Sequence, residues 1–258
     1  MMTTTATVQA MRQRAELTYK QNLQHGRHGW LRLTPAYSVR LVEHVLAEFG
    51  HGARSVFEPF SGTGTTPLCA GYHGMQALAT DINPFLIWLG RVKGAQYTEG
   101  QAQEVAIAAQ HIARRLLDGT ARAAIVPPLK NIERWWHPME LKFVTCLRSE
   151  VDRVPEGAIR DLLKVAFCRT MMSLSNAAFN HQSMSFKAPD SVRQISVSLE
   201  VLQTNFVEQF LADARTIVDA CTDNPGGEIR IEEADARSLS SLGIGARSFD
   251  LLITSPPY

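Results

Sequence analysis

The sequence predicts an α/β protein with a parallel sheet of four strands and a large helical insertion between the second and third strands. A strand over residues 54–58 leads directly into a glycine-rich loop and a helix, and a second strand over residues 75–80 follows. Strand character returns at residues 228–232 and again at 249–253. The intervening residues 99–222 have an almost entirely helical pattern, and they are too many for an ordinary connection between strands.

Composition places the chain among globular proteins. Of its 258 residues, 45% are hydrophobic and 20% are charged, which excludes an intrinsically disordered chain. No apolar stretch approaches the roughly 20 residues of a membrane-spanning helix, and the N-terminus lacks the layout of a secretory signal. We therefore expect a cytoplasmic protein with no membrane partner.

Charge and cysteine content restrict the possible ligands. The net charge of +1 gives weak overall attraction to nucleic acid, although it does not exclude a local basic groove. The four cysteines are scattered without the spacing of metal ligands, so we expect reduced thiols and no metal site.

Helical periodicity and capping residues define the remaining elements. Residues 7–23 have the pattern of a moderately amphipathic helix, and Thr34-Pro35 is suited to begin a second helix that ends at Gly50. A helix over residues 84–93 follows the second strand. In 190–222, apolar residues recur at steps of three and four, the clearest helical pattern in the chain.

These elements suggest three parts. Residues 1–98 would hold the N-terminal helices and the cofactor-binding half of the sheet, and residues 99–225 the helical insertion. Residues 226–258 would hold the third and fourth strands and the last segment of the sequence.

The glycine-rich loop has the composition of a nucleotide-binding loop. Glycines such as Gly62 and Gly64 let the backbone approach a ligand, and the helix starting near Thr65 offers free N–H groups. Asp81, at the end of the second strand, can accept hydrogen bonds from both ribose hydroxyls. The alternatives are a structural turn or a nicotinamide-binding loop, but the latter would require glycine where the sequence has Pro67.

Two motifs together resemble those of the S-adenosylmethionine-dependent DNA amino-methyltransferases, which act on cytosine N4 or adenine N6. The first is the loop from Phe57 to Thr66, Phe-Glu-Pro-Phe-Ser-Gly-Thr-Gly-Thr-Thr. The second is the tetrapeptide Ser-Pro-Pro-Tyr over residues 255–258, which follows an apolar strand. The resemblance covers residues 30–98 and 228–258, and it implies the Rossmann-like fold of the class I methyltransferases.

The resemblance implies a set of site residues. Catalysis would rest on Ser255, Pro256, Pro257 and Tyr258. S-adenosylmethionine would be held by Thr34, Pro35, Glu58, Pro59, Phe60, Ser61, Gly62, Thr63, Gly64, Thr65, Thr66, Asp81, Ile82, Asn83, Asp235 and Ala236.

The tetrapeptide suits methyl transfer to an amino nitrogen whose lone pair is delocalised into the base. The hydroxyl of Ser255 and the carbonyl of Pro256 can accept both amino hydrogens and free that lone pair for attack. Tyr258 offers a ring on which an extruded base can stack. Serine at the first position favours cytosine N4 over adenine N6, since most adenine enzymes of the family have aspartate there.

The resemblance also implies partners. The substrate would be double-stranded DNA, in a restriction-modification or defence system that brings the protein to the nucleoid. The family's sheet has seven strands and this sequence supplies the first four, so we expect a second chain with strands five to seven, or a longer parent chain. Two alternatives stay open: a tRNA amino-methyltransferase, and a cofactor-binding subunit without catalytic activity.

Overall fold

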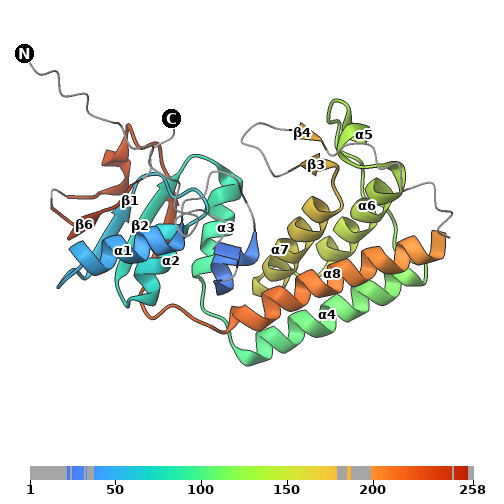
Figure 1. The fold of residues 1–258 in the computed structure, drawn as a ribbon, viewed down its shortest axis with the longest axis horizontal. Helices are drawn as coiled ribbons and strands as arrows, with labels where there is room; N and C mark the ends of the chain where they lie inside the picture. Colours follow the sequence, from blue (N-terminus) through green and yellow to red (C-terminus); the bar gives the residue numbers. More distant parts are fainter. Residues whose placement is uncertain are drawn as a thin grey trace, which may run out of the picture.

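The computed structural model describes residues 22–23, 25–31, 33, 38–178, 185–186, 199–245 and 247–254. The helix predicted over residues 7–23 lies almost entirely outside these ranges. Figure 1 shows a sheet with its helices on one side of the view and a bundle of long helices on the other.

A parallel sheet of four strands forms the first part, as predicted. The strand order is β5-β2-β1-β6, so the strands lie in the chain order three, two, one, four. This is the order expected for the first four strands of a class I methyltransferase. The strands are β1 (Ser55–Glu58), β2 (Gln76–Asp81), β5 (Ile229–Glu233) and β6 (Leu251–Leu252).

One face of the sheet is covered by three helices, which Figure 1 shows beside it. Apolar side chains of the first helix, including Val42 and Leu46, share a core with Val56 and Ala77 of the sheet. The third helix begins with Pro84 and is capped by Asn83, whose side chain accepts the Phe85 N–H at 3.0 Å. These helices are α1 (Val39–Phe49), α2 (Thr65–Tyr72) and α3 (Pro84–Gly94).

The opposite face is only partly covered by the described residues. Phe57 is in register with Leu78 on one side and Leu252 on the other, so the three side chains share this face. Phe57 is covered by the ring of Phe249, with centroids 5.4 Å apart, but Leu252 is 64% exposed. A hollow lined by Leu78, Arg230 and Phe249, among others, lies against this face.

The second part is a helical bundle between β2 and β5. Its elements are α4 (Glu99–Leu117), α5 (Ile132–Trp135), α6 (Pro138–Arg153), α7 (Ala158–Ser173) and α8 (Leu199–Cys221). The helix α4 begins with a capping box, in which the Thr98 hydroxyl accepts the Gln101 N–H at 3.2 Å. Its core is continuous with Leu89 and Val92 of α3, and the indole of Trp88 donates to Asp161 of α7 at 3.0 Å. The bundle is therefore packed against the sheet's third helix.

A small hairpin corrects the prediction that residues 99–222 are almost entirely helical. The strands β3 (Ala177–Ala178) and β4 (Ser185–Phe186) pair in antiparallel fashion next to α5 (Figure 1). The ring of Phe186 meets Trp135 edge-on at 5.2 Å, so the hairpin packs on the tryptophan pair. Two-residue strands are too short to produce a recognisable alternation in the sequence.

A buried histidine near the sheet makes the free energy of unfolding depend on pH. His28, in the short helix η3 (Gly26–Trp30), is buried, and its Nε2 lies 3.8 Å from the sulfur of Cys69. Burial lowers the pKa of His28 to about 3, and the charges of Lys93 and His25 add to the effect. The folded protein keeps the ring neutral, so the unfolded chain takes up the proton first as the pH falls.

We expect the free energy of unfolding to fall by about 2 kcal/mol between pH 7 and pH 5 through His28 alone. The sign follows from the lowered pKa, because the stabilisation is complete above pH 6.5 and is lost towards pH 3. Urea denaturation of the wild type and His28→Asn at both pH values measures it. The variant should lose this part of the pH dependence; an identical change in both proteins would contradict the assignment.

Candidate functional site

The predicted cofactor loop connects the carboxyl end of β1 to the first turn of α2. Gly62 has φ 51° and Gly64 has φ 76°, conformations that side chains other than glycine rarely adopt. The Ser61 N–H donates to the carbonyl of Thr80 at 2.7 Å, and the Thr80 hydroxyl donates to the carbonyl of Pro59 at 3.0 Å. The end of β2 therefore fixes both sides of the loop.

Asp81 is placed at this junction as the sequence predicted. One carboxylate oxygen accepts the Gly62 N–H at 2.9 Å, and the other accepts the Asn83 N–H at 2.9 Å. Each oxygen keeps a further lone pair, so the carboxylate can still accept hydrogen bonds from a ligand. The neighbouring Ile82 is 70% exposed and offers an apolar surface beside it.

The residues of the loop fit S-adenosylmethionine. Helix α2 begins directly after the loop, with Gly64 at its N-cap, and its positive dipole end favours a negatively polarised ligand group there. The hydroxyl of Ser61 is buried and has no hydrogen-bond partner within the described residues. An unpartnered buried hydroxyl is costly, so a ligand that supplies its partner would be favoured.

Two charged residues are buried next to the loop. Glu58, predicted to face the ammonium group of methionine, is 1% exposed. Lys93 of α3 is 2% exposed and donates from Nζ to the carbonyl of Thr63 at 3.1 Å. Sequence reasoning missed Lys93, although its position three residues after Gly90 and four after Leu89 places it on the buried side of α3.

Asp235 lies just beyond the carboxyl end of β5, on the same edge of the sheet as Asp81. The Ala234 N–H donates to the carbonyl of Asp81 at 3.1 Å, which joins the two strand ends. Asp235 forms an ion pair with Arg237, whose guanidinium donates to both carboxylate oxygens at 3.0 and 2.6 Å. These hydrogen bonds lower the pKa of Asp235 to about 2, so the carboxylate is charged at neutral pH.

Several predicted site residues lie outside the described part of the chain. These are Thr34 and Pro35 and the tetrapeptide Ser255, Pro256, Pro257 and Tyr258. The described chain does lead up to the tetrapeptide: the Ile253 N–H donates to the carbonyl of Phe57 at 3.1 Å, one residue before Glu58. The strand that precedes the tetrapeptide is therefore paired with the strand that precedes the cofactor loop.

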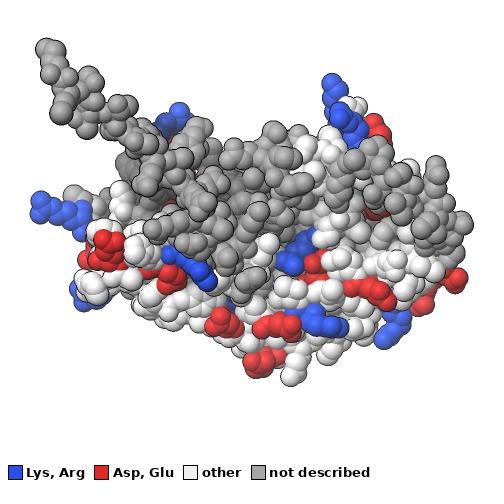
Figure 2. Space-filling model, viewed as in Figure 1, with Lys and Arg blue, Asp and Glu red and all other residues white. Residues whose placement is uncertain are grey.

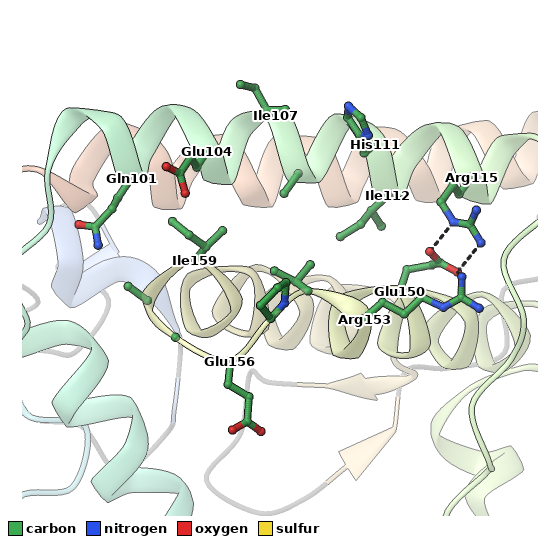
Figure 3. Close-up of a pocket in the computed structure, with 15 residues that line it drawn as sticks. Gln101, Glu104, Ile107, His111, Ile112, Arg115, Glu150, Arg153, Glu156 and Ile159 are labelled. Atoms are coloured by element: carbon green, nitrogen blue, oxygen red, sulfur yellow. Dashed lines mark hydrogen bonds and ion pairs between the residues drawn. The ribbon is translucent and has the colours of Figure 1, made fainter.

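A separate cleft of about 850 Å³ lies between α4 and the turn joining α6 to α7 (Figure 3). Figure 3 shows Arg115 and Arg153 both directed at Glu150 at one end of it, with the Arg115 Nε donating to Glu150 at 2.6 Å. None of the predicted site residues lines this cleft. The glycine loop therefore remains the better candidate, because it combines the carboxylate of Asp81 with the buried hydroxyl of Ser61.

The surface charge is mixed where it is described. Figure 2 shows Lys and Arg interspersed with Asp and Glu along the described part of one face. This distribution agrees with the net charge of +1.

Among the residues described, no cluster of side chains suited to a metal ion occurs. In the same residues, no helix has both the length and the apolar character needed to cross a bilayer.

Comparison with known proteins supports the resemblance that the two motifs indicated. The chain is 20% identical over 231 residues to the type II methyltransferase M.MvaI of Kocuria varians, across 80% of this chain. It is 33% identical over 69 residues to the type II methyltransferase M.BsoBI of Geobacillus stearothermophilus, across 26% of this chain. The chain is thus similar to two type II methyltransferases. No family model and no solved structure matches it.

This relationship confirms the resemblance that the two motifs indicated, and it agrees with the order of the parallel sheet. The chain spans about half the length of M.MvaI, since the match covers 46% of that relative, and 14% of M.BsoBI. The type II methyltransferases that the chain resembles imply S-adenosylmethionine, and the Asp81 carboxylate and the buried Ser61 hydroxyl suit such a ligand.

Proposed function

We propose that this chain is part of an enzyme that transfers a methyl group to an exocyclic amino group of a flipped base in double-stranded DNA. The observation that supports this most directly is the pairing of β6 with β1. Phe57 and Leu252 are in register, and the Ile253 N–H donates to the carbonyl of Phe57. In the sequence Ser255 comes two residues after Ile253, and β6 is parallel to β1, whose carboxyl end leads into the loop where Asp81 accepts the Gly62 N–H.

The proposed chemistry assigns a role to each group. Bound S-adenosylmethionine supplies a methyl carbon on a sulfonium. The Ser255 hydroxyl and the Pro256 carbonyl would accept the two amino hydrogens and direct the nitrogen lone pair at that carbon. The N–C bond forms as the C–S bond breaks, and one amino proton leaves to solvent. Tyr258 would stack on the extruded base.

The first residue of the tetrapeptide supports a preference for cytosine N4 over adenine N6. A serine hydroxyl can accept one amino hydrogen but carries no charge, unlike the aspartate that the resemblance associates with most adenine enzymes. We place the enzyme in a restriction-modification or defence system in a bacterial cytoplasm, near the nucleoid. The type II methyltransferases among its relatives favour this setting.

We further propose that a second polypeptide, or a further part of the same one, supplies strands five to seven. In the described residues β6 pairs with β1 alone. Leu252 is 64% exposed on the open face, where an additional strand and its helices would cover it. An apolar edge strand left exposed tends to pair with other chains, which favours a partner here.

Methylation assays on the completed enzyme test the function. The chain, expressed with the polypeptide that the neighbouring reading frame encodes, is incubated with tritiated S-adenosylmethionine and either duplex DNA or tRNA. We expect label in DNA, recovered as N4-methylcytosine after digestion to nucleosides. Ser255→Ala should lower the rate about 100-fold, because one acceptor for the amino group is lost.

The exposed Ser248 provides a matched control, since Ser248→Ala should leave the rate unchanged. Label recovered as N6-methyladenine would overturn the base preference, and label in tRNA alone would favour the RNA enzyme. If Ser255→Ala and Tyr258→Ala both keep full activity, the chain is a cofactor-binding subunit without catalytic residues. Full activity of the purified single chain as a stable monomer would contradict the proposal that a second polypeptide is required.

A further inference from the structure

Lys93 is a buried cation that the proposed chemistry does not use. It lies in the last turn of α3 and is 2% exposed. In the described residues it forms no ion pair with a carboxylate, and burial lowers its pKa to about 8. A buried charge without a counter-ion destabilises a fold, so a reason other than stability is needed for its presence.

The hydrogen bond of Lys93 is directed at the cofactor loop. Its Nζ donates to the carbonyl of Thr63 at 3.1 Å. Thr63 is flanked by Gly62 and Gly64, whose backbones have the most conformational freedom of any residue type. Anchoring the Thr63 carbonyl restricts the peptide units on either side of it. A loop that is fixed before binding loses less entropy when the ligand arrives.

The backbone of Lys93 is anchored as well. Its carbonyl accepts a hydrogen bond from Arg27 at 2.8 Å, and Arg27 also donates to Asn224 beyond the end of α8. The charged and titratable groups near Lys93 include this guanidinium and the ring of His28, whose pKa the lysine helps to lower. Lys93 therefore connects the loop to the junction between the sheet and the helical bundle.

We propose that Lys93 is a positioning residue that holds the cofactor loop in its binding conformation through the Thr63 carbonyl. The inference rests on the proposed function, because it takes S-adenosylmethionine to be the ligand of the loop. Lys93 would contribute to affinity without contacting the reacting atoms. An apolar residue at this position would avoid the cost of burying a charge, but it could not donate to the Thr63 carbonyl.

Binding and hydrogen exchange of the full chain test the proposal. Lys93→Met removes the hydrogen bond and keeps the apolar stem, so we expect the Kd for S-adenosylmethionine to rise about tenfold by calorimetry. Without ligand, exchange of the amides in residues 59–66 should become faster, while Tm stays equal or rises because the buried charge is gone. The exposed Lys142 gives the control, as Lys142→Met should change neither quantity.

Each failure has a separate signature. A wild type that does not bind S-adenosylmethionine contradicts the proposed function itself. A wild type that binds and a Lys93→Met variant that binds equally well overturn the role of Lys93. Faster exchange spread evenly over the sheet would also overturn it, since that would indicate a general loss of stability. If Lys93→Met does not fold, Lys93→Gln is measured against the same outcomes.

Discussion

Replacing Arg27 by methionine is expected to lower the free energy of unfolding by about 4 kcal/mol or more. The side chain is fully buried, and its N–H groups donate to neutral acceptors at the C-terminal ends of α3 and α8. The acceptors are the carbonyls of Lys93, Ala95, Ala220 and Cys221 and the side-chain oxygen of Asn224. Without the guanidinium, these buried acceptors would lose their donors together.

The aromatic residues around Arg27 add to the expected loss. The guanidinium carbon lies 5.6 Å from the ring centroid of Trp30 and 5.1 Å from that of Tyr97. Cation–π contacts of this kind are strengthened when water is excluded, as it is at this buried position. Arg27→Lys keeps the charge but has one donor group in place of a planar fork, so it should not restore stability.

Urea denaturation followed by circular dichroism measures this effect. Arg27→Met and Arg27→Lys are compared with Arg40→Lys, a matched change at an exposed position of α1. We expect Arg40→Lys to differ from the wild type by less than about 0.5 kcal/mol. A stable Arg27→Lys variant would contradict the argument, because it would mean that charge alone, without the fork of donors, holds the junction.

The sheet could be predicted because its signals are local. The strand predicted over residues 54–58 is Ser55–Glu58, and the loop and carboxylate that follow stand where the pattern placed them. The last strand is shorter than predicted, since Leu251–Leu252 replaces residues 249–253. Asp250, which the prediction placed within the strand, precedes it instead. Its carboxylate accepts the backbone N–H groups of Arg54 and Ser55 at 2.8 and 3.0 Å. Pairing on one side alone leaves few ladder bonds to extend the strand.

The contacts that join the two parts of the molecule could not be predicted. Arg27 and Lys93 are separated by 66 residues in the sequence, yet one donates to the carbonyl of the other. A charged residue in a sequence is ordinarily read as exposed, because burial of its charge is costly. These two are buried because the ends of α3 and α8 meet at η3, and that meeting depends on how the bundle packs. The division into three parts by residue number stays a prediction.

The largest effect on cofactor binding is expected from Asp81→Ala, which should weaken the affinity for S-adenosylmethionine roughly 1,000-fold. Two losses combine in this variant. On the proposed binding mode the ligand loses a charged acceptor for its ribose hydroxyls, and the Gly62 N–H loses the carboxylate oxygen that holds it at 2.9 Å. Hydrogen bonds to charged groups are the stronger ones, so each loss is larger than for a neutral pair.

Calorimetric titration of the full chain with S-adenosylmethionine measures the loss, and Glu233 supplies the control. Glu233 is in register with Asp81 on the adjacent strand and is exposed, so Glu233→Ala removes the same charge from the same edge of the sheet. It should change the affinity less than about threefold, because surface charges contribute little through water. Asp81→Asn keeps the shape and one acceptor oxygen, which separates the two losses. If Asp81→Asn binds as tightly as the wild type, the carboxylate charge is not what the ligand recognises, and Asp81 serves only to hold the loop.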